Sequence, residues 1–140
     1  MAQLRTQPQA PFAIGDVVTL QDRIELMTVE GVRVGTFGTE VDCCWFDAED
    51  CLHFRTFPSG QLDVFPRPLP ERAIGLNMEV RLRSRGPVMT VRALRRKGRT
   101  AFADCGWTGP MQAERRRLFP RAALVLTLLE RFEALDGQEL

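Results

Sequence analysis

The chain has 140 residues and a mass of 15.9 kDa, enough for one ordinary domain or two very small ones and too little for most large catalytic architectures. Hydrophobic residues make up 44% and charged residues 26% of the sequence, which excludes wholesale disorder. The net charge of +1 conceals two halves of opposite sign: residues 1–70 hold 5 basic and 10 acidic side chains, whereas residues 71–140 hold 14 and 8.

The N-terminal half contains short β-rich segments separated by turn signals. Residues 1–11 carry no such pattern and are expected to be a flexible N-terminus, whereas residues 12–66 have the pattern of a small all-β unit of acidic character. Four or five short strands in about 50 residues favour a small closed or nearly closed barrel over a sandwich. The expected strands lie at 17–20, near 27–29, near 43–45 and at 62–65, with turns at 21–22, 35–38 and 47–50 and a short turn or helix after Phe57-Pro58.

A Pro-rich stretch, residues 67–75, is typical of a short linker. Residues 76–128 then repeat the all-β pattern with basic character, with breaks at 84–87, 97–98 and 108–110 and a last strand at 124–128. Apolar residues at helical spacing from 128 to 135, followed by Gly137, predict a helix and tail over 129–140. We expect this helix either to pack across a barrel or to join a partner, in a monomer or a homodimer.

An internal repeat with an offset of 62 residues relates the two halves. Between residues 17–64 and 79–126, 14 of 48 positions are identical without a gap. Repeats of this kind indicate two copies of one supersecondary unit. The shared motifs are Val18-x-Leu20 with Val80-x-Leu82, Met27-Thr-Val29 with Met89-Thr-Val91, Asp42-Cys-x-Trp45 with Asp104-Cys-x-Trp107, and Phe57-Pro58 with Phe119-Pro120.

Strand parity separates the repeated positions into an inner and an outer set. In a strand, residues two apart share a face, so the apolar pairs of the shared motifs are expected to point inward together. The intervening residues are then expected on the surface, where the two copies diverge. These surface positions are Val17, Thr19, Thr28, Asp42 and Cys44 in the first copy and Glu79, Arg81, Thr90, Asp104 and Gly106 in the second.

At these residues the sequence resembles the YodC-like family of small bacterial proteins. The motifs that carry the resemblance are Gly15-Asp-Val-Val-Thr-Leu20, Cys43-Cys-Trp-Phe46 and Gly86-Pro-Val-Met-Thr-Val91, and the two copies together cover about two thirds of the chain. Compared with the family's pattern, the first copy lacks the Gly-Gly-Pro segment that stands before Met-Thr-Val. The second copy lacks the Gly-Asp before its first strand and the Phe after its Trp. The resemblance implies two tandem SH3-like β-barrels and brings no established activity.

Basic residues of the second unit form the candidate binding site. Strand parity places Arg81, Arg83 and Arg92 on the outer side of the unit, and residues 95–99 are expected to form a cationic hairpin turn. Arginine can pair bidentately with phosphate, which favours a sequence-tolerant contact with a nucleic-acid backbone. The candidate residues are Arg81, Arg83, Arg92, Arg95, Arg96, Lys97, Arg99, Arg115, Arg116 and Arg117. Only Phe102 is a candidate exposed ring for base stacking.

Other classes of function are weighed against this one. A protein-interaction module is the main alternative: the basic unit would meet an acidic protein surface and the acidic first unit a protein partner, as in an accessory or inhibitory factor of a phage or other mobile element. The opposite charges could also let the halves attract each other or drive head-to-tail association.

Catalytic, metal and membrane functions are not expected. His53 is the only histidine, and a zinc set from Cys43, Cys44, Cys51 and His53 lacks a Cys-x-x-Cys pair, with the neighbouring cysteines pointing to opposite faces. We therefore predict a non-enzymatic protein without a cofactor or metal. No apolar run approaches the roughly 18 residues of a membrane span, and residues 1–11 do not have the pattern of an export signal. The expected location is the cytoplasm of a bacterium, for a bacterial or a phage protein, with reduced thiols.

Overall fold

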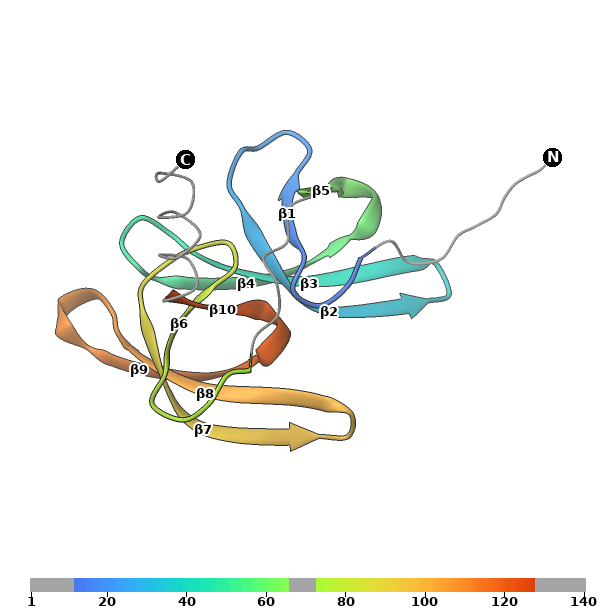
Figure 1. Cartoon of the computed structure of the whole chain (residues 1–140). Helices are drawn as coiled ribbons and strands as arrows, with labels where there is room; N and C mark the ends of the chain where they lie inside the picture. The colour runs from blue at the N-terminus through green and yellow to red at the C-terminus, as the bar shows by residue number, and fades with distance from the viewer. Residues whose placement is uncertain (1–11, 66–72, 128–140) are drawn as a thin grey trace, which may run out of the picture.

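The computed structural model describes residues 12–65 and 73–127, which form two antiparallel sheets of five strands each (Figure 1). We call residues 12–65 the first unit and residues 73–127 the second unit. The all-β prediction is confirmed. The expected N-terminal segment 1–11, most of the linker and the C-terminal helix over 129–140 lie outside the described residues. No helix in the described ranges is long and apolar enough to cross a membrane.

Both units have the same strand order. The first sheet contains β1 (Val17–Leu20), β2 (Met27–Gly35), β3 (Gly38–Phe46), β4 (Leu52–Pro58) and β5 (Leu62–Phe65) in the order β4-β3-β2-β1-β5. The second contains β6 (Glu79–Leu82), β7 (Met89–Lys97), β8 (Thr100–Thr108), β9 (Glu114–Pro120) and β10 (Leu124–Leu126) in the order β10-β6-β7-β8-β9. In the described strands each sheet has two edges, so hydrogen bonding does not close either one into a barrel.

The offset of 62 residues holds for the strands themselves. Every strand of the second unit starts 62 residues after its counterpart, and a 3-10 turn precedes the last strand in both units, as η1 (Ser59–Gln61) and η3 (Arg121–Ala123). The second unit adds a further 3-10 turn, η2 (Pro110–Gln112), before β9. Even an irregularity is repeated: the β2–β3 register shifts between Val29 and Gly31, and the β7–β8 register shifts between Val91 and Ala93. The predicted duplication is therefore confirmed at the level of strand register.

Each unit buries most of the inner side chains that the repeat preserves, and Leu20 and Trp45 of the first unit are partly buried. The core of the first unit contains Phe12, Val18, Met27, Val29, Val41, Cys43, Phe57 and Leu62. The core of the second contains Ile74, Val80, Leu82, Met89, Val91, Ala103, Cys105, Trp107, Phe119, Ala123 and Leu124, together with Cys44 from the first unit. Phe46 and Leu52, also from the first unit, pack against this second core. The second unit thus completes its core with side chains of the first.

The prediction of an exposed outer face is wrong for Thr28 and Cys44, both of which are fully buried. The reason is that the part of the outer face that carries Thr28 and Cys44 packs against the second unit, so these two side chains are covered. Thr28 and Ser84 join the units by hydrogen bonds: the Oγ1 atom of Thr28 lies 2.6 Å from Oγ of Ser84 and accepts from its backbone nitrogen at 2.8 Å. Thr19, also expected on the surface, is buried because its hydroxyl bonds the carbonyls of Arg23 and Glu25, each at 2.9 Å.

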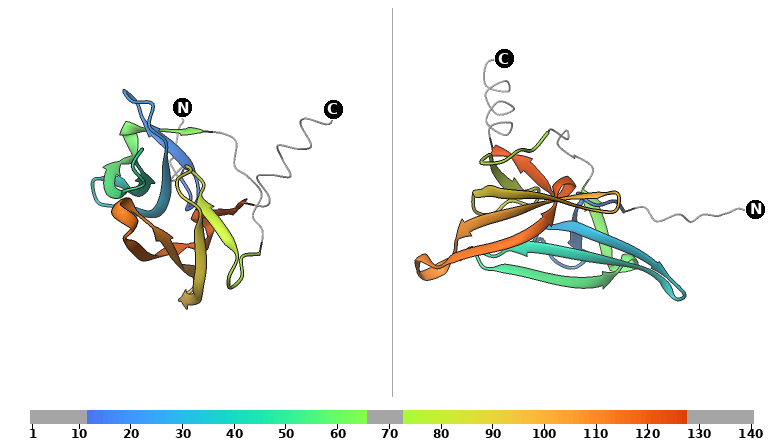
Figure 2. Two further views of the ribbon diagram at one scale, coloured as in Figure 1. Left: turned by 90° about the vertical axis from the view of Figure 1, so that its left-hand side faces the viewer. Right: turned by 90° about the horizontal axis from the view of Figure 1, so that it is seen from below.

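The two long hairpins lie in separate layers and extend toward the same side of the molecule in Figure 1, β2–β3 in the upper layer and β7–β8 in the lower one. Figure 2 shows the same two hairpins from two further directions, with the second sheet against one face of the first. The outer face of β7, β8 and β9 therefore points away from the first sheet.

Candidate nucleic-acid interface

The hairpin between β7 and β8 carries four of the predicted basic residues. The strands are joined by a two-residue turn in which Gly98 has a φ of 62°, a conformation that glycine adopts without strain. Arg95 pairs across the ladder with Phe102, and Lys97 pairs with Thr100. These pairs share the outer face with Asp104, whereas Arg96 pairs with Ala101 on the inner side. The predicted cationic hairpin turn is confirmed as a hairpin, and its charges are divided between two faces.

Arg92 lies on the outer face, as strand parity predicts, and the β-bulge at this position shifts the parity of the residues after it, so that Arg95 and Lys97 share that face. Arg92 is the extra residue between Val91 and Ala93, and its Nε atom lies 3.4 Å from the position of a Cβ atom built on Gly106. Since Gly106 has no side chain, the long stem of Arg92 can lie across β8. Arg116 is directly opposite Gly106 in β9. The two arginines therefore approach the same hollow, which is also lined by Thr90, Thr108 and Glu114.

Four basic residues make up what we call the outer basic face: Arg92, Arg95, Lys97 and Arg116, all exposed. Phe102 lies beside Arg95 on this face and is half-buried. On this face, Asp104 accepts a hydrogen bond from Nε of Arg116 at 3.2 Å. The other three basic residues form no ion pair with any residue of the two described ranges. The outer basic face therefore has positive charge that the sheet itself does not neutralise.

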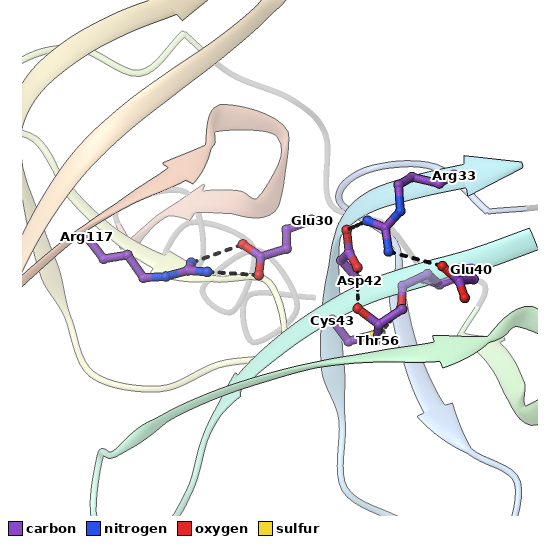
Figure 3. A network of polar contacts seen from close by, with 8 residues as sticks. Glu30, Arg33, Glu40, Asp42, Cys43, Thr56 and Arg117 are labelled. Atoms are coloured by element: carbon purple, nitrogen blue, oxygen red, sulfur yellow. Dashed lines mark hydrogen bonds and ion pairs between the residues drawn. The ribbon is translucent and has the colours of Figure 1, made fainter. Parts of the chain in front are cut away.

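The predicted site residue Arg117 belongs instead to the contact between the units. Its Nη1 and Nη2 atoms donate to Oε1 and Oε2 of Glu30, both at 3.0 Å (Figure 3). The guanidinium carbon lies 5.3 Å from the ring centre of Phe54 and 4.9 Å from that of Phe119. Burial acts to lower the pKa of Arg117, but hydrogen bonds and the charge of Glu30 outweigh it, so the pKa is raised. This arginine is held as a cation by its partner and is not available to a phosphate.

Three further predicted site residues are not on the outer basic face. Arg81 and Arg83 are half-buried on or just after β6, where both have polar or charged contacts, and Nε of Arg83 donates to the carbonyl of Ala122 at 2.8 Å. Glu79, which pairs with Thr90, separates Arg81 from Arg92 along that side of the ladder. Arg115 shares the inner side of β9 with Arg117. Arg81 and Arg92, both expected on the outer side of the first two strands of the unit, therefore do not form one continuous basic patch. The remaining predicted residue, Arg99, is exposed in the hairpin turn.

The matching face of the first unit has a different electrostatic character. Arg33, the counterpart of Arg95, forms an ion pair with Asp42 and lies 3.3 Å from Oε1 of Glu40 (Figure 3). Asp42 also accepts a hydrogen bond from the Thr56 hydroxyl at 2.5 Å. These contacts, with the hydrogen bond to Asp42 the strongest cause, raise the pKa of Arg33. Arg33 is thus paired with two acids, whereas its counterpart Arg95 has Phe102 in place of Glu40 and Asp104 pairs with Arg116 instead.

The neighbouring cysteines point to opposite faces, as predicted. Cys43 lies in the first core and Cys44 in the second. Burial raises the pKa of Cys43 to about 12, and burial likewise raises that of Cys44. His53 lies 2.8 Å from Oδ2 of Asp47 and stacks on Trp45, with ring centres 5.4 Å apart. Of the four residues weighed as a zinc set, Cys43 and Cys44 thus lie in different cores, whereas Cys51, whose backbone nitrogen donates to Oδ1 of Asp47 at 3.0 Å, lies near His53.

Sequence reasoning missed two residues that shape the site. Gly106 was treated only as a divergent surface position, although the exchange of Cys44 for a glycine is the change that opens the path of Arg92. Glu30 was not considered, although the repeat aligns it with Arg92 and so exchanges an acid for a base. The register shifts that place Glu30 and Arg92 at β-bulges have no sequence signal in a single chain. No protein-family model, no curated protein and no solved structure matches this chain.

Proposed function

We propose that the protein is a non-enzymatic binding protein whose outer basic face contacts the phosphate backbone of a nucleic acid. The observation that carries the proposal is the set of Arg92, Arg95, Lys97 and Arg116 on one uncovered sheet face. Arginine side chains that lie across a strand can approach phosphates from the side, and three of the four charges form no ion pair within residues 12–65 and 73–127. Backbone contacts of this kind give affinity without reading sequence.

The half-buried ring of Phe102 supports a supplementary stacking contact with an unpaired base. Base–aromatic stacking contributes about 1–3 kcal/mol per base where the ring is accessible. A single ring is a poor platform, so we propose that the backbone contacts dominate and that duplexes and single strands are both bound.

We also propose that each unit is an SH3-like barrel and that the chain is a tandem form of the YodC-like type. The proposal is supported by the strand order, in which the last strand lies beside the first, by the 3-10 turn before that last strand, and by the repeated inner motifs. A cytoplasmic location in a bacterium or a phage-infected cell is part of the same proposal.

The test is a salt titration with a fluorescent DNA duplex and a fluorescent RNA strand, followed by anisotropy. We expect binding that weakens between about 50 and 200 mM salt, because counterions are released from the phosphates. In the triple variant R92A/R95A/K97A the slope of log K against log salt for the duplex should fall by up to about 2.7, at about 0.9 for each lost contact.

The matched control is R23A/R33A/R55A, which removes the same charge from the first unit. It should retain most of the affinity and the full slope. If the two triple variants lost the same affinity, binding would depend on net charge and not on the outer basic face. An absence of binding at low salt would contradict the proposed function outright. Protein recognition, the alternative considered from the sequence, is favoured by a separate observation on the first unit.

A further inference from the structure

The contact between the two units uses a different part of each one. The first unit contributes the outer face of its sheet. The second contributes an inner rim, which we define as Ser84, Gly86, Trp107 and Arg117 and call the second rim. Thr28 bonds Ser84, the ring of Phe46 meets Trp107 edge-on with centres 5.3 Å apart, and Glu30 pairs with Arg117.

The repeat gives the first unit an equivalent rim, which the described residues leave uncovered. The first rim consists of Asp22, Ile24, Trp45 and Arg55, each 62 residues before its counterpart. Ile24 is 94% exposed and Arg55 is exposed. Arg55 lies over the ring of Phe57 at 5.6 Å, as Arg117 lies over Phe119 at 4.9 Å.

Arg55 also borders a hollow. The hollow is lined by Leu20, Gln21, Asp22, Arg23, Arg55, Thr56, Phe57, Pro58 and Gln61. Arg55 forms no ion pair with any residue in 12–65 or 73–127, whereas Arg117 has a carboxylate at 3.0 Å. The first rim thus has the arginine, the tryptophan and the apolar contact of a surface that is occupied in the second unit.

We propose that the first rim is a docking surface for a partner protein that presents the outer face of a β-sheet with a carboxylate directed at Arg55. The second unit shows which face such a rim takes: a sheet whose bulge carries Glu30. A rim that contains an exposed large apolar side chain, and an arginine without an ion pair among the described residues, fits a carboxylate-bearing protein surface and not a phosphate backbone alone.

The rim also sets the size of one partner side chain. Gly86 has a φ of 132°, and a Cβ atom at this position would lie 2.5 Å from the ring of Phe46. The first rim has Ile24 at this place. A ring like that of Phe46 is therefore excluded from the first rim, and the partner must carry a small side chain there.

A second copy of the chain would offer side chains small enough for the first rim, but it would not offer a carboxylate to Arg55. The outer face of the second unit has Gly106 and Thr108 where the first has Cys44 and Phe46, so it is small enough for the first rim. However, its bulge residue is Arg92, which would face Arg55 with the same charge. Like charges in juxtaposition disfavour the contact. The partner is therefore a different protein, and Arg92 prevents head-to-tail growth of this one.

The experiment uses the full chain as its own probe. The single variant R92E presents a carboxylate at the bulge of the second unit, and we expect it to associate head to tail in sedimentation velocity at concentrations up to about 1 mM. The variant R55E should associate as well, because its glutamate would face Arg92. The double variant R55E/R92E should return to the monomer, because two carboxylates would then face each other. The control K97E has the same charge change as R92E, away from the bulge, and should stay monomeric.

Three results would overturn the proposal. The first is a monomeric R92E, and the second is association of R92E that R55E does not reverse. The third is association of R92E only after removal of residues 128–140, which would assign the rim to the chain's own C-terminal segment. The proposal does not depend on nucleic-acid binding, since R55E leaves the outer basic face intact and the anisotropy titration reports on that face separately.

Discussion

At the scale of single residues, the pair of Glu30 and Arg117 has the most unusual environment. The side chains are 13% and 28% exposed, the two hydrogen bonds are parallel, and two aromatic rings flank the guanidinium. Exposed ion pairs contribute little, but removal of one partner from a covered pair leaves the other charge without its hydrogen bonds. The pair therefore stabilises the contact between the units mainly through the cost of breaking it.

Glu30→Gln tests this account, because it retains the shape of the side chain and removes its charge. We expect a loss of about 2 kcal/mol in the free energy of unfolding, between the values for exposed and buried pairs. Urea unfolding followed by tryptophan fluorescence measures it. Arg33→Gln is the control, since Arg33 is in an exposed pair and its loss should cost clearly less than that of Glu30. Equal effects of the two substitutions would mean that the Glu30 pair has no special role.

The buried thiols give the protein a pH dependence on the alkaline side. The pKa of Cys43 and that of Cys105 are raised by burial from 9.0 to about 12. In the unfolded chain the thiols ionise near the ordinary value, so thiolate formation stabilises the unfolded state as the pH rises from 9 toward 12. The free energy of unfolding should fall across this window by up to about 1.4 kcal/mol per pH unit for each buried thiol. In Cys105→Ala the fall should be less steep by one thiol's share, and an unchanged slope would contradict the assignment.

At the scale of strands and turns, the inner pattern could be predicted from the sequence and the outer pattern could not. Val18, Met27 and Val29 are buried because parity and apolar character agree at these positions. Thr28 and Cys44 are equally buried, but what covers them is the other unit, and strand parity contains no information about contacts between sheets. The bulge at Arg92 is also invisible to parity, and because it shifts the register it exchanges the inner and outer faces of the residues that follow, which brings Arg95 and Lys97 to the outer face.

Two glycines allow the packing between the units to be measured separately from backbone strain. Gly38 and Gly86 have nearly the same φ, 131° and 132°, but only a Cβ atom at Gly86 would meet the ring of Phe46. We expect Gly38→Ala to cost about 1 kcal/mol from strain alone. Gly86→Ala should cost a further 1–3 kcal/mol, about the penalty of overpacking a filled site. Thermal unfolding compares the two, and an equal cost would show that Phe46 does not pack there.

At the scale of the whole molecule, duplication followed by asymmetric packing explains why the outer faces of the two sheets differ. The outer face of the first sheet is used to complete the core of the second unit, through Cys44, Phe46 and Leu52. Among the described residues, nothing of the first unit covers the corresponding face of the second sheet, and this face carries the exposed basic residues. The predicted set of ten basic residues contained this face, but it also contained Arg117, whose place in the contact between units could not be inferred from composition.

The most direct test compares two equivalent positions, Cys44 and residue 106, in the variant G106C. Alkylation at neutral pH, followed by peptide mass mapping, reports the accessibility of each thiol, with half-exposed Cys51 as an internal reference. The account predicts that the cysteine introduced at position 106 is modified rapidly and that Cys44 is modified only as fast as the protein unfolds. Rapid modification of Cys44 in the folded protein, or protection of position 106, would contradict the proposed packing of the two units.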